Sequence, residues 1–427
     1  MVLDKQPWSE EYDAIVVGSG PAGAAVAREL SKSKKKVLIL ERGGNQPLKE
    51  GLRTAAAVVR AVSVGDKLAA SRAFTTGGTT AVYFAVADSP PLETFLSLGI
   101  DLSRELDEAR RELPLAVLPD ELLGAQAIRL RESALALGYP WKKNTMLIDL
   151  AKCASGYNYA AKWNARIYVH DAVEEGATLI NGARVLKVLT DNDGAIGVEY
   201  RHRKGRKDFE VRRAFGSKII LAAGGSESPI ILRDSGVQNV AKGGFYCHPG
   251  FGVFGLVSGL KAGENFGASM GATLEGGIGV GDANFARTLY RMVMFGSRRL
   301  IRAFLHSQSI GVGVVVQEGS GGELRENGRY YKQLKEEDLG KLAKGEEVAR
   351  QIIQNAGGKH LFKTTLGAAH VGGAVRIKEH VDENLQTEYR NLYVCDGSVI
   401  PDSVKISPTL TLICLGKHLG KHLSGAL

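Results

Sequence analysis

Cysteine is scarce in this chain, and its four residues, Cys153, Cys247, Cys395 and Cys414, are widely separated. No two of them form a C-x-x-C pair, so the sequence offers neither a redox dithiol nor a cysteine-rich metal site. We therefore expect no metal centre, and a reduced protein of the cytoplasm.

Long apolar runs and blocks of like charge are also missing. No apolar stretch approaches the about 20 residues that a membrane-spanning helix needs. Residues 1–11 carry acids and no apolar run, so we expect no secretory signal. The net charge of +9 is spread along the chain, which favours a solvated basic surface and no nucleic-acid partner. A peripheral membrane contact or a partner subunit stays open.

Glycine is abundant, with 53 of 427 residues. The glycines lie at motif positions and turns without a fixed period, so neither a collagen-like chain nor a repeat array fits. The length allows two domains, and a hydrophobic content of 44% is normal for a globular protein with a sizeable core.

The first glycine cluster predicts a dinucleotide site. A buried strand at residues 12–17 leads into Gly18, Gly20 and Gly23, spaced as G-x-G-x-x-G before a helix at residues 24–30. The first glycine permits the tight turn, the second lets a diphosphate approach, and the third lets the helix pack closely. The unpaired N–H groups of the helix N-terminus then face the phosphate.

A second apolar strand at residues 37–40 ends in Glu41. An acid at this spacing hydrogen-bonds the adenosine ribose and disfavours a 2′-phosphate. The unit does not decide between NAD and FAD, and a glycine-rich turn in an unrelated α/β fold is the alternative. Further on, residues 185–189 and 195–200 predict a hairpin around a turn at 192–194, and residues 218–221 predict another buried strand.

Five ordered motifs resemble the glucose-methanol-choline oxidoreductase family and cover nearly the whole chain. They are the glycine fingerprint, TTGGTTA at 75–81, the strand ending in AAGGSESP at 222–229, AHVGG at 369–373, and NLYVCDGS at 391–398 followed by SPTLT at 407–411. The resemblance implies an α/β fold with a Rossmann-like FAD-binding domain and a substrate domain on an antiparallel sheet. It assigns 1–90, 165–245 and 365–427 to the FAD-binding domain, and 91–164 and 246–364 to the substrate or cap domain.

The same resemblance implies which residues bind FAD. No histidine lies in 75–87, where some relatives attach the flavin covalently, so we expect dissociable FAD. Relatives of one subgroup carry several cysteines near Cys153; here it stands alone, which speaks against an iron-sulfur or zinc centre. The expected cofactor-binding residues are Gly18, Gly20, Pro21, Ala22, Gly23, Glu41, Arg42, Gly77, Gly78, Thr79, Thr80, Val185, Ala223, Gly224, Asp396, Gly397, Pro408 and Thr409.

Alcohol oxidation by a flavin needs a base for the hydroxyl proton, and histidine has a suitable pKa. By resemblance, His370 is that base; a core histidine bonded within the sheet is the alternative. The family's usual second residue, Asn or His, is replaced by Ser407, which can still orient a substrate hydroxyl. Tyr83 replaces a usual Asn and favours an aromatic-lined pocket. His248 is expected to be structural.

These residues predict an enzyme that oxidises a CH–OH group of a small, apolar or aromatic alcohol. Oxygen, a quinone or a protein stay open as the electron acceptor. The alternatives are a flavin subunit of a larger electron-transfer complex and a non-redox, FAD-containing lyase. A plain NAD-dependent dehydrogenase fits the first 45 residues only.

Residues 285–305 predict a basic amphipathic helix, with five arginines between its apolar positions. A solvated helix with its apolar side on the core is the favoured interpretation. A helix that lies on a membrane, or gates entry of an apolar substrate, is the alternative.

Overall fold

The described part of the chain begins with the predicted β-α-β unit. The structure is a computed structural model that describes residues 11–192, 194–205, 208–402, 404 and 407–427. Strand β1 (Glu11–Val17), helix α1 (Pro21–Lys32) and strand β2 (Val37–Glu41) follow one another, and the two strands pair in parallel. Both strands are buried along nearly their whole length, because apolar side chains fill both of their faces.

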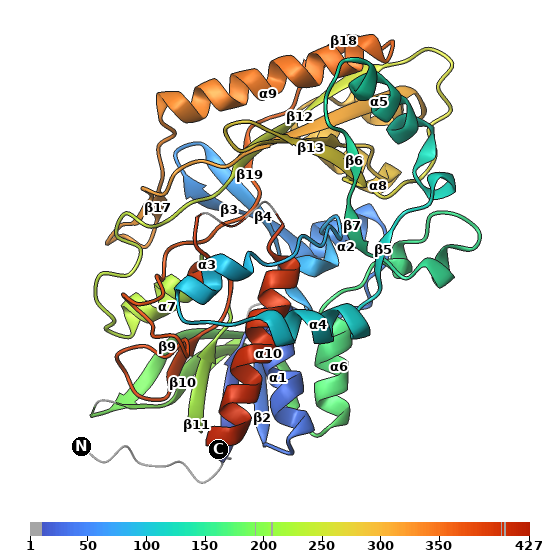
Figure 1. The fold of residues 1–427 in the computed structure, drawn as a ribbon. Helices are drawn as coiled ribbons and strands as arrows, with labels where there is room; N and C mark the ends of the chain where they lie inside the picture. Colours follow the sequence, from blue (N-terminus) through green and yellow to red (C-terminus); the bar gives the residue numbers. More distant parts are fainter. Residues whose placement is uncertain (1–10, 193, 206–207, 403, 405–406) are drawn as a thin grey trace.

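The first sheet extends this unit on both sides (Figure 1). The hairpin expected from the sequence is present, with Asp193 of its turn outside the described residues. Strands β8, β2, β1, β11 and β20 are parallel to their neighbours, whereas β9 and β10 are antiparallel additions. The order is β8-β2-β1-β11-β10-β9, with β20 also on β11, where β8 is Thr178–Asn181, β9 Ala183–Asp191, β10 Gly194–Arg203, β11 Phe209–Leu221 and β20 Leu392–Val394.

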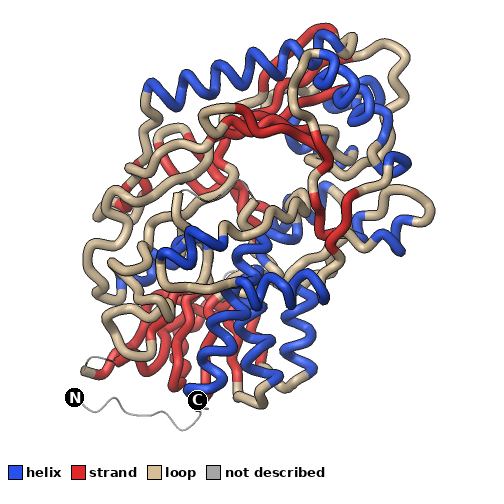
Figure 2. The backbone as a smooth tube through the Cα atoms, viewed as in Figure 1, coloured by secondary structure: helices blue, strands red, loops and turns tan. Residues whose placement is uncertain are grey.

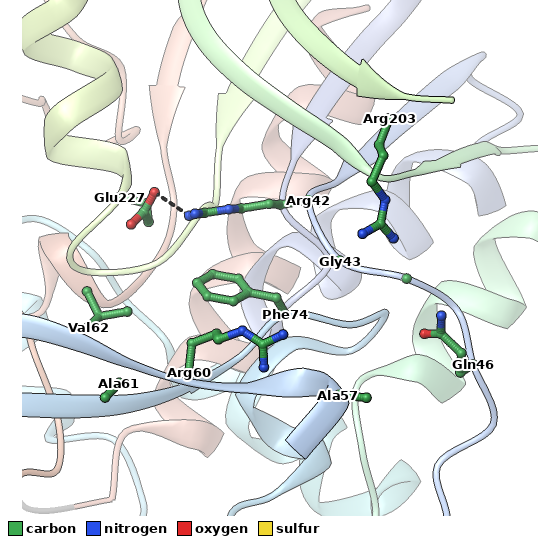
Figure 3. A pocket seen from close by; sticks show the side chains of 11 residues that line it. Arg42, Gly43, Gln46, Ala57, Arg60, Ala61, Val62, Phe74, Arg203 and Glu227 are labelled. Atoms are coloured by element: carbon green, nitrogen blue, oxygen red, sulfur yellow. Dashed lines mark hydrogen bonds and ion pairs between the residues drawn. The ribbon is translucent and has the colours of Figure 1, made fainter. Parts of the chain in front are cut away.

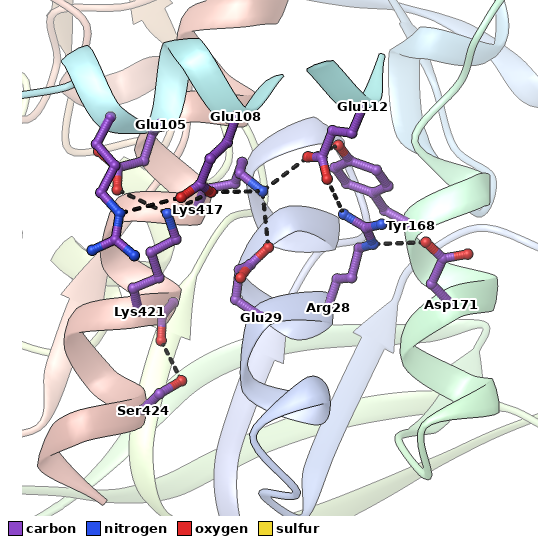
Figure 4. A network of polar contacts seen from close by, with 12 residues as sticks. Arg28, Glu29, Glu105, Glu108, Glu112, Tyr168, Asp171, Lys417, Lys421 and Ser424 are labelled. Atoms are coloured by element: carbon purple, nitrogen blue, oxygen red, sulfur yellow. Dashed lines mark hydrogen bonds and ion pairs between the residues drawn. The ribbon is translucent and has the colours of Figure 1, made fainter. Parts of the chain in front are cut away.

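A buried ionic network joins the helices beside this sheet (Figure 4). Lys417 of α10 (Thr409–Ala426) is 3% exposed and its Nζ lies 3.1 Å from Glu29 of α1 and 2.8 Å from Glu112. Arg28 donates to the same Glu112 at 2.9 Å and to Asp171 at 2.6 Å. The network spans α1, α4 (Ser103–Glu112), α6 (Arg166–Glu174) and α10. The C-terminal helix is thereby fixed against the N-terminal one.

The second sheet carries the longest helix on its outer face (Figure 1). Helix α9 (Glu336–Asn355) lies close to β15, because Gly345 leaves no side chain between them: a Cβ there would stand 2.4 Å from Val314. The order is β3-β4-β19-β12-β15-β14-β13-β6, with β18 on β12, where β3 is Val59–Gly65, β4 Leu68–Ala73, β6 Lys142–Lys143, β12 Pro249–Leu256, β13 Met270–Leu274, β14 Ile278–Asp282, β15 Ser309–Val316, β18 Lys359–Lys363 and β19 Gly367–Ala368.

Shorter elements and loops connect the two sheets (Figure 2). They are α2 (Leu52–Val58), α3 (Leu92–Ser97), α5 (Gly124–Ala136), α7 (Ser228–Asp234), α8 (Arg287–Gly296), β5 (Leu115–Val117), β7 (Thr145–Leu147), β16 (Glu323–Leu324) and β17 (Tyr330–Tyr331).

The helix expected over residues 285–305 is shorter than predicted. Helix α8 ends at Gly296, Arg298 adopts a left-handed φ of 56°, and a separate 3-10 turn covers Ile301–Phe304. A left-handed residue directly after the C-cap, here Ser297, ends an α-helix, and the amphipathic pattern continues past that point without the helix.

Strands β3 and β4 fall inside residues 1–90, which the sequence analysis assigned to the FAD-binding domain, yet they pair into the second sheet. The domain boundaries otherwise stay a prediction. Within the described ranges, no helix is long and apolar enough to cross a membrane. The same part of the chain holds no cluster of three or more potential metal ligands.

Candidate active site

A cavity of about 880 Å³ lies between the two sheets, and most of the residues predicted to bind cofactor line it. Gly23 and Gly77 are the exceptions among them. Both predicted catalytic residues, His370 and Ser407, also line it. The lining residues from the prediction are Gly18, Gly20, Pro21, Ala22, Glu41, Arg42, Gly78, Thr79, Thr80, Val185, Ala223, Gly224, Asp396, Gly397, Pro408 and Thr409.

The three glycines of the fingerprint meet three different steric situations. Gly18 has a φ of +101°, and a Cβ on it would stand 2.3 Å from the Ala222 carbonyl oxygen. A Cβ on Gly23 would stand 2.2 Å from the Gly18 oxygen, so this glycine sets the contact between turn and helix. A Cβ on Gly20 would meet no protein atom within 4 Å. The turn therefore leaves open space at Gly20, where a diphosphate would approach.

Glu41 organises the same turn. Its buried carboxylate accepts hydrogen bonds from the Ser19 hydroxyl at 2.6 Å, the Ser19 amide at 3.2 Å and the Gly43 amide at 2.7 Å. Burial raises the pKa of Glu41, and these three donors oppose the rise. The carboxylate also borders the cavity at the end of β2, which fits the predicted contact with a ribose hydroxyl.

A second glycine loop packs onto the first. Gly77 has a φ of 89° and its amide donates to the Ser19 hydroxyl at 3.1 Å. A Cβ on Gly78 would stand 3.1 Å from the Gly20 Cα. The loop of residues 77–80 is therefore held beside the turn of residues 18–23, and Gly77 contacts that turn through Ser19 without lining the cavity.

Asp396 connects the ends of β11 and β20. Its carboxylate accepts from the Gly224 amide at 2.8 Å, the Ser228 hydroxyl at 2.5 Å and the Ser398 amide at 2.8 Å. Gly397, next to it, borders the cavity. The aspartate thus shapes the backbone around the cavity, and the contact of this turn with FAD stays a prediction.

Arg72 is a charged lining residue that the sequence analysis missed. It lies on β4, and its guanidinium makes no hydrogen bond or ion pair with any residue that the structure describes. Burial lowers the pKa of Arg72 to about 10, and the carboxylates of Asp396 and Glu227 oppose the fall. A half-buried cation without a partner, in the same cavity as a glycine-rich turn and the uncapped N-terminus of α1, fits an anionic dinucleotide.

His370 follows β19 and faces the cavity. Its Nδ1 is buried without a hydrogen-bond partner in the described part of the chain. Burial lowers the pKa of His370 well below its ordinary value, and the nearby rings and charges of His248 and Arg72 lower it further. The imidazole is therefore neutral near pH 7 and able to accept a proton.

His248 contacts that imidazole, which the sequence analysis did not foresee. The two rings lie edge to face with centroids 5.8 Å apart, and both ring nitrogens of His248 are buried without a described partner. Burial lowers the pKa of His248 to about 4. Glu318 fixes the backbone here, since its carboxylate accepts from the His248 amide at 2.9 Å.

Ser407 lies at the other predicted catalytic position. Its hydroxyl donates to the Val86 carbonyl oxygen at 2.7 Å, and its amide donates to Asp88 at 3.3 Å. With its hydrogen engaged, the hydroxyl oxygen keeps lone pairs that can accept a hydrogen bond from a ligand.

The remaining wall of the cavity is largely aromatic and apolar. Phe84 and Phe285 stack with centroids 5.2 Å apart, and Tyr83 donates to the Trp163 carbonyl oxygen at 2.6 Å. Lys162, also missed from the sequence, has its Nζ 4.6 Å from the Tyr159 ring centre. Burial lowers the pKa of Lys162 to about 8. Helix α8 adds Thr288, Leu289, Met292 and Val293 to this wall.

A smaller polar pocket of about 580 Å³ shares Arg42 and Glu227 with the large cavity (Figure 3). Arg42 donates to Glu227 at 2.9 Å, while Arg60 and Arg203 complete a basic lining. The arginines that line this pocket place positive charge next to the end of β2.

Comparisons with known proteins agree with this geometry. A model of the GMC oxidoreductase family matches residues 101–268, and a model of the NAD(P)-binding Rossmann-like domain matches residues 16–46. The uncharacterized GMC-type oxidoreductase Rv0492c of Mycobacterium tuberculosis is 32% identical over 252 residues. The chain belongs to the glucose-methanol-choline (GMC) oxidoreductase family.

The match to Rv0492c covers 53% of this GMC chain but only 39% of that relative. Long-chain-alcohol oxidase FAO4B of Arabidopsis thaliana is 25% identical over 94% of the chain and 65% of its own length. Among solved structures, pyridoxine 4-oxidase from Mesorbium loti superposes with a TM-score of 0.72 at 14% identity, covering 96% of this chain and 99% of that one. The predicted α/β fold with a Rossmann-like domain is confirmed.

Proposed function

We propose that this GMC protein is an FAD-dependent oxidoreductase that converts the CH–OH group of an alcohol to a carbonyl. The observation that carries the proposal is one cavity that joins the glycine-rich turn to an unpartnered, neutral His370. The family membership and the alcohol oxidase among its relatives support the reaction class. The phosphate-facing turn, Glu41 and Arg72 are the groups that would hold the dinucleotide.

In this reaction FAD supplies the acceptor for the hydride that leaves the alcohol carbon. His370 takes the hydroxyl proton at a ring nitrogen, and its lowered pKa keeps the imidazole unprotonated before each turnover. Ser407 orients the same hydroxyl by donating to its oxygen, for which the Ser407 hydrogen turns away from the Val86 carbonyl oxygen that it contacts without substrate. The proton therefore moves from substrate to His370 while Ser407 limits how the hydroxyl can turn.

The substrate we propose is an apolar or aromatic alcohol. The stacked Phe84 and Phe285, with the apolar side chains of α8, offer contact area to a ring or an alkyl chain. Oxygen, a quinone or a protein remain as candidate acceptors for the electrons. We propose non-covalent FAD, since residues 75–87 hold no histidine. The four free cysteines agree with a reducing, cytoplasmic setting.

Reconstitution followed by reduction tests the proposal. Purified protein is mixed with FAD, desalted and examined for the visible absorbance of a bound flavin; denaturation should then release the flavin. Aromatic and long-chain alcohols are added without oxygen, and we expect at least one to bleach the flavin. Absence of bound flavin would refute the cofactor. Bound flavin that no alcohol bleaches would refute the reaction and favour the lyase alternative, and a stoichiometric protein that co-purifies would favour the subunit alternative.

A further inference from the structure

Four large apolar side chains are exposed together at the end of α8 and in the segment after it. Phe295, Leu300, Ile301 and Phe304 are 40%, 62%, 80% and 72% exposed. We call these four residues the 295–304 surface. Large apolar side chains gathered on one short segment mark a contact site more often than isolated ones do.

The chain around this surface carries one sign of charge. From residue 283 to residue 317 there is no Asp or Glu, and five arginines lie within that stretch. Arg298 and Arg299 are exposed next to the apolar side chains. The only carboxylate paired to the arginines of the stretch within the described residues is Glu264, which lies 3.4 Å from Arg287 at the far end of α8. The 295–304 surface is therefore apolar with an uncompensated basic rim.

Buried side chains and hydrogen bonds hold the exposed segment to the rest of the protein. Tyr290 and Met294 are buried, and the Tyr290 hydroxyl donates to the Arg302 carbonyl oxygen at 2.9 Å. The Arg302 guanidinium donates to the His360 carbonyl oxygen at 3.0 Å and lies 4.8 Å from the centre of the Phe362 ring. The apolar side chains of the 295–304 surface are therefore exposed on a segment whose other side is packed against the protein.

The same helix borders the active-site cavity on another side. Leu289, Met292 and Val293 line that cavity and precede the exposed side chains by two to fifteen residues. A single short segment therefore has one side at the cavity wall and its end at the apolar surface.

From these observations we propose that the 295–304 surface docks onto the surface of an anionic phospholipid bilayer. Leu300, Ile301 and Phe304 enter the boundary between head groups and acyl chains, and Arg298 and Arg299 contact lipid phosphates. Charge complementarity favours lipid over an apolar protein patch, because the rim offers cations without acids. Docking is independent of the proposed reaction; it would bring the wall of the cavity next to a source of apolar alcohols.

Vesicle sedimentation of the 427-residue protein tests docking. Vesicles of phosphatidylcholine alone and of phosphatidylcholine with phosphatidylglycerol are compared at low and high salt. We expect binding to the anionic vesicles that weakens with salt. The double variant Ile301→Ser/Phe304→Ser should lose about tenfold or more in partitioning, and Arg298→Gln/Arg299→Gln about fivefold for each arginine.

Matched controls separate docking from general surface effects. Leu96→Ser removes a leucine on α3 that is 62% exposed, the same fraction as Leu300, and Arg104→Gln removes an exposed arginine far from the segment. Both controls should bind vesicles like the unchanged protein. A Phe304→Trp protein should show a blue-shifted tryptophan emission with anionic vesicles only.

Three results would overturn the proposal. The first is absence of binding to anionic vesicles, or equal binding to neutral ones. The second is an equal loss in the Leu96→Ser or Arg104→Gln controls. The third is an oligomer in gel filtration without lipid that Ile301→Ser/Phe304→Ser dissolves, which would make the surface an interface between copies of the chain. Equal thermal midpoints and flavin content across the variants show that a loss reflects docking and neither folding nor the proposed reaction.

Discussion

The rings of His370 and His248 meet edge to face, with centroids 5.8 Å apart and planes at 86°. Neither ring has a carboxylate within hydrogen-bond reach in the described residues, and burial lowers the pKa of both. A neutral His370 therefore lines the cavity, with a neutral His248 buried behind it. Burial keeps both rings neutral at pH 7, and the neighbouring His248 lowers the pKa of His370 further.

This pair predicts the pH dependence of catalysis. A base works in its unprotonated form, so kcat/KM should fall only as the pH drops through the pKa of His370. Because that pKa is lowered, the acid limb should lie below about pH 6.5, with a plateau across neutral pH. Steady-state rates across this range measure it. A half-maximal kcat/KM above neutral pH would contradict a depressed His370.

Gly20→Ala should weaken FAD binding without unfolding the protein. Gly20 has an ordinary φ of −66°, and an added Cβ meets only open cavity. The methyl group would instead collide with the diphosphate and reduce FAD affinity by about tenfold or more. Titration of the apoprotein by flavin fluorescence measures the affinity. Gly340→Ala, at an exposed glycine of α9, is the matched control and should bind FAD normally.

Ser407→Ala should lower turnover modestly. The substitution removes one hydrogen-bond donor to the oxygen of the substrate hydroxyl, which corresponds to about a two- to tenfold loss in kcat/KM. The rate of flavin bleaching under anaerobic conditions measures it, with FAD affinity as the control. A loss as large as that of a His370 variant would mean that Ser407 has a role beyond orientation.

Asp282→Asn should change how stability depends on pH. Burial raises the pKa of Asp282 to about 7, although the Met270 amide donates to it at 2.7 Å. Between the unfolded-state pKa and the folded-state pKa, the folded protein binds more protons than the unfolded chain. The wild type should therefore lose about 1.4 kcal/mol of unfolding free energy relative to the variant for each pH unit of rise through this window, up to about pH 7.

Urea unfolding of both apoproteins across that window measures the difference. The lowered pKa values of His248 and His370 destabilise both proteins alike as the pH falls below about 6.5, so their contribution cancels in the comparison. A difference that stays constant with pH would contradict the raised pKa of Asp282.

The sequence was most informative where a local pattern decides the structure. The β-α-β unit and the hairpin β9–β10 follow from apolar period and glycine position. The cavity gathers most of the predicted site residues, because the motif order of a known family already encodes their long-range proximity.

The structural features that the sequence did not predict depend mostly on contacts between distant segments. Arg72 reaches the cavity through β4, whose pairing to β19 rests on Ala70 beside Ala368. Lys162 lies in an irregular stretch held to the 81–83 wall by the bond from Tyr159 to the Ala81 oxygen. The early end of α8 depends on the left-handed conformation of Arg298, which the spacing of apolar residues does not predict.

The central claim is that His370 removes the hydroxyl proton during alcohol oxidation by bound FAD. Anaerobic rapid mixing of FAD-loaded His370→Ala protein with a substrate alcohol tests it most directly, with exposed His422→Ala as the matched control. We expect bleaching slowed by about 100- to 10 000-fold at unchanged FAD affinity, and a normal rate in the control. A His370→Ala protein that binds FAD and bleaches at the full rate would contradict it.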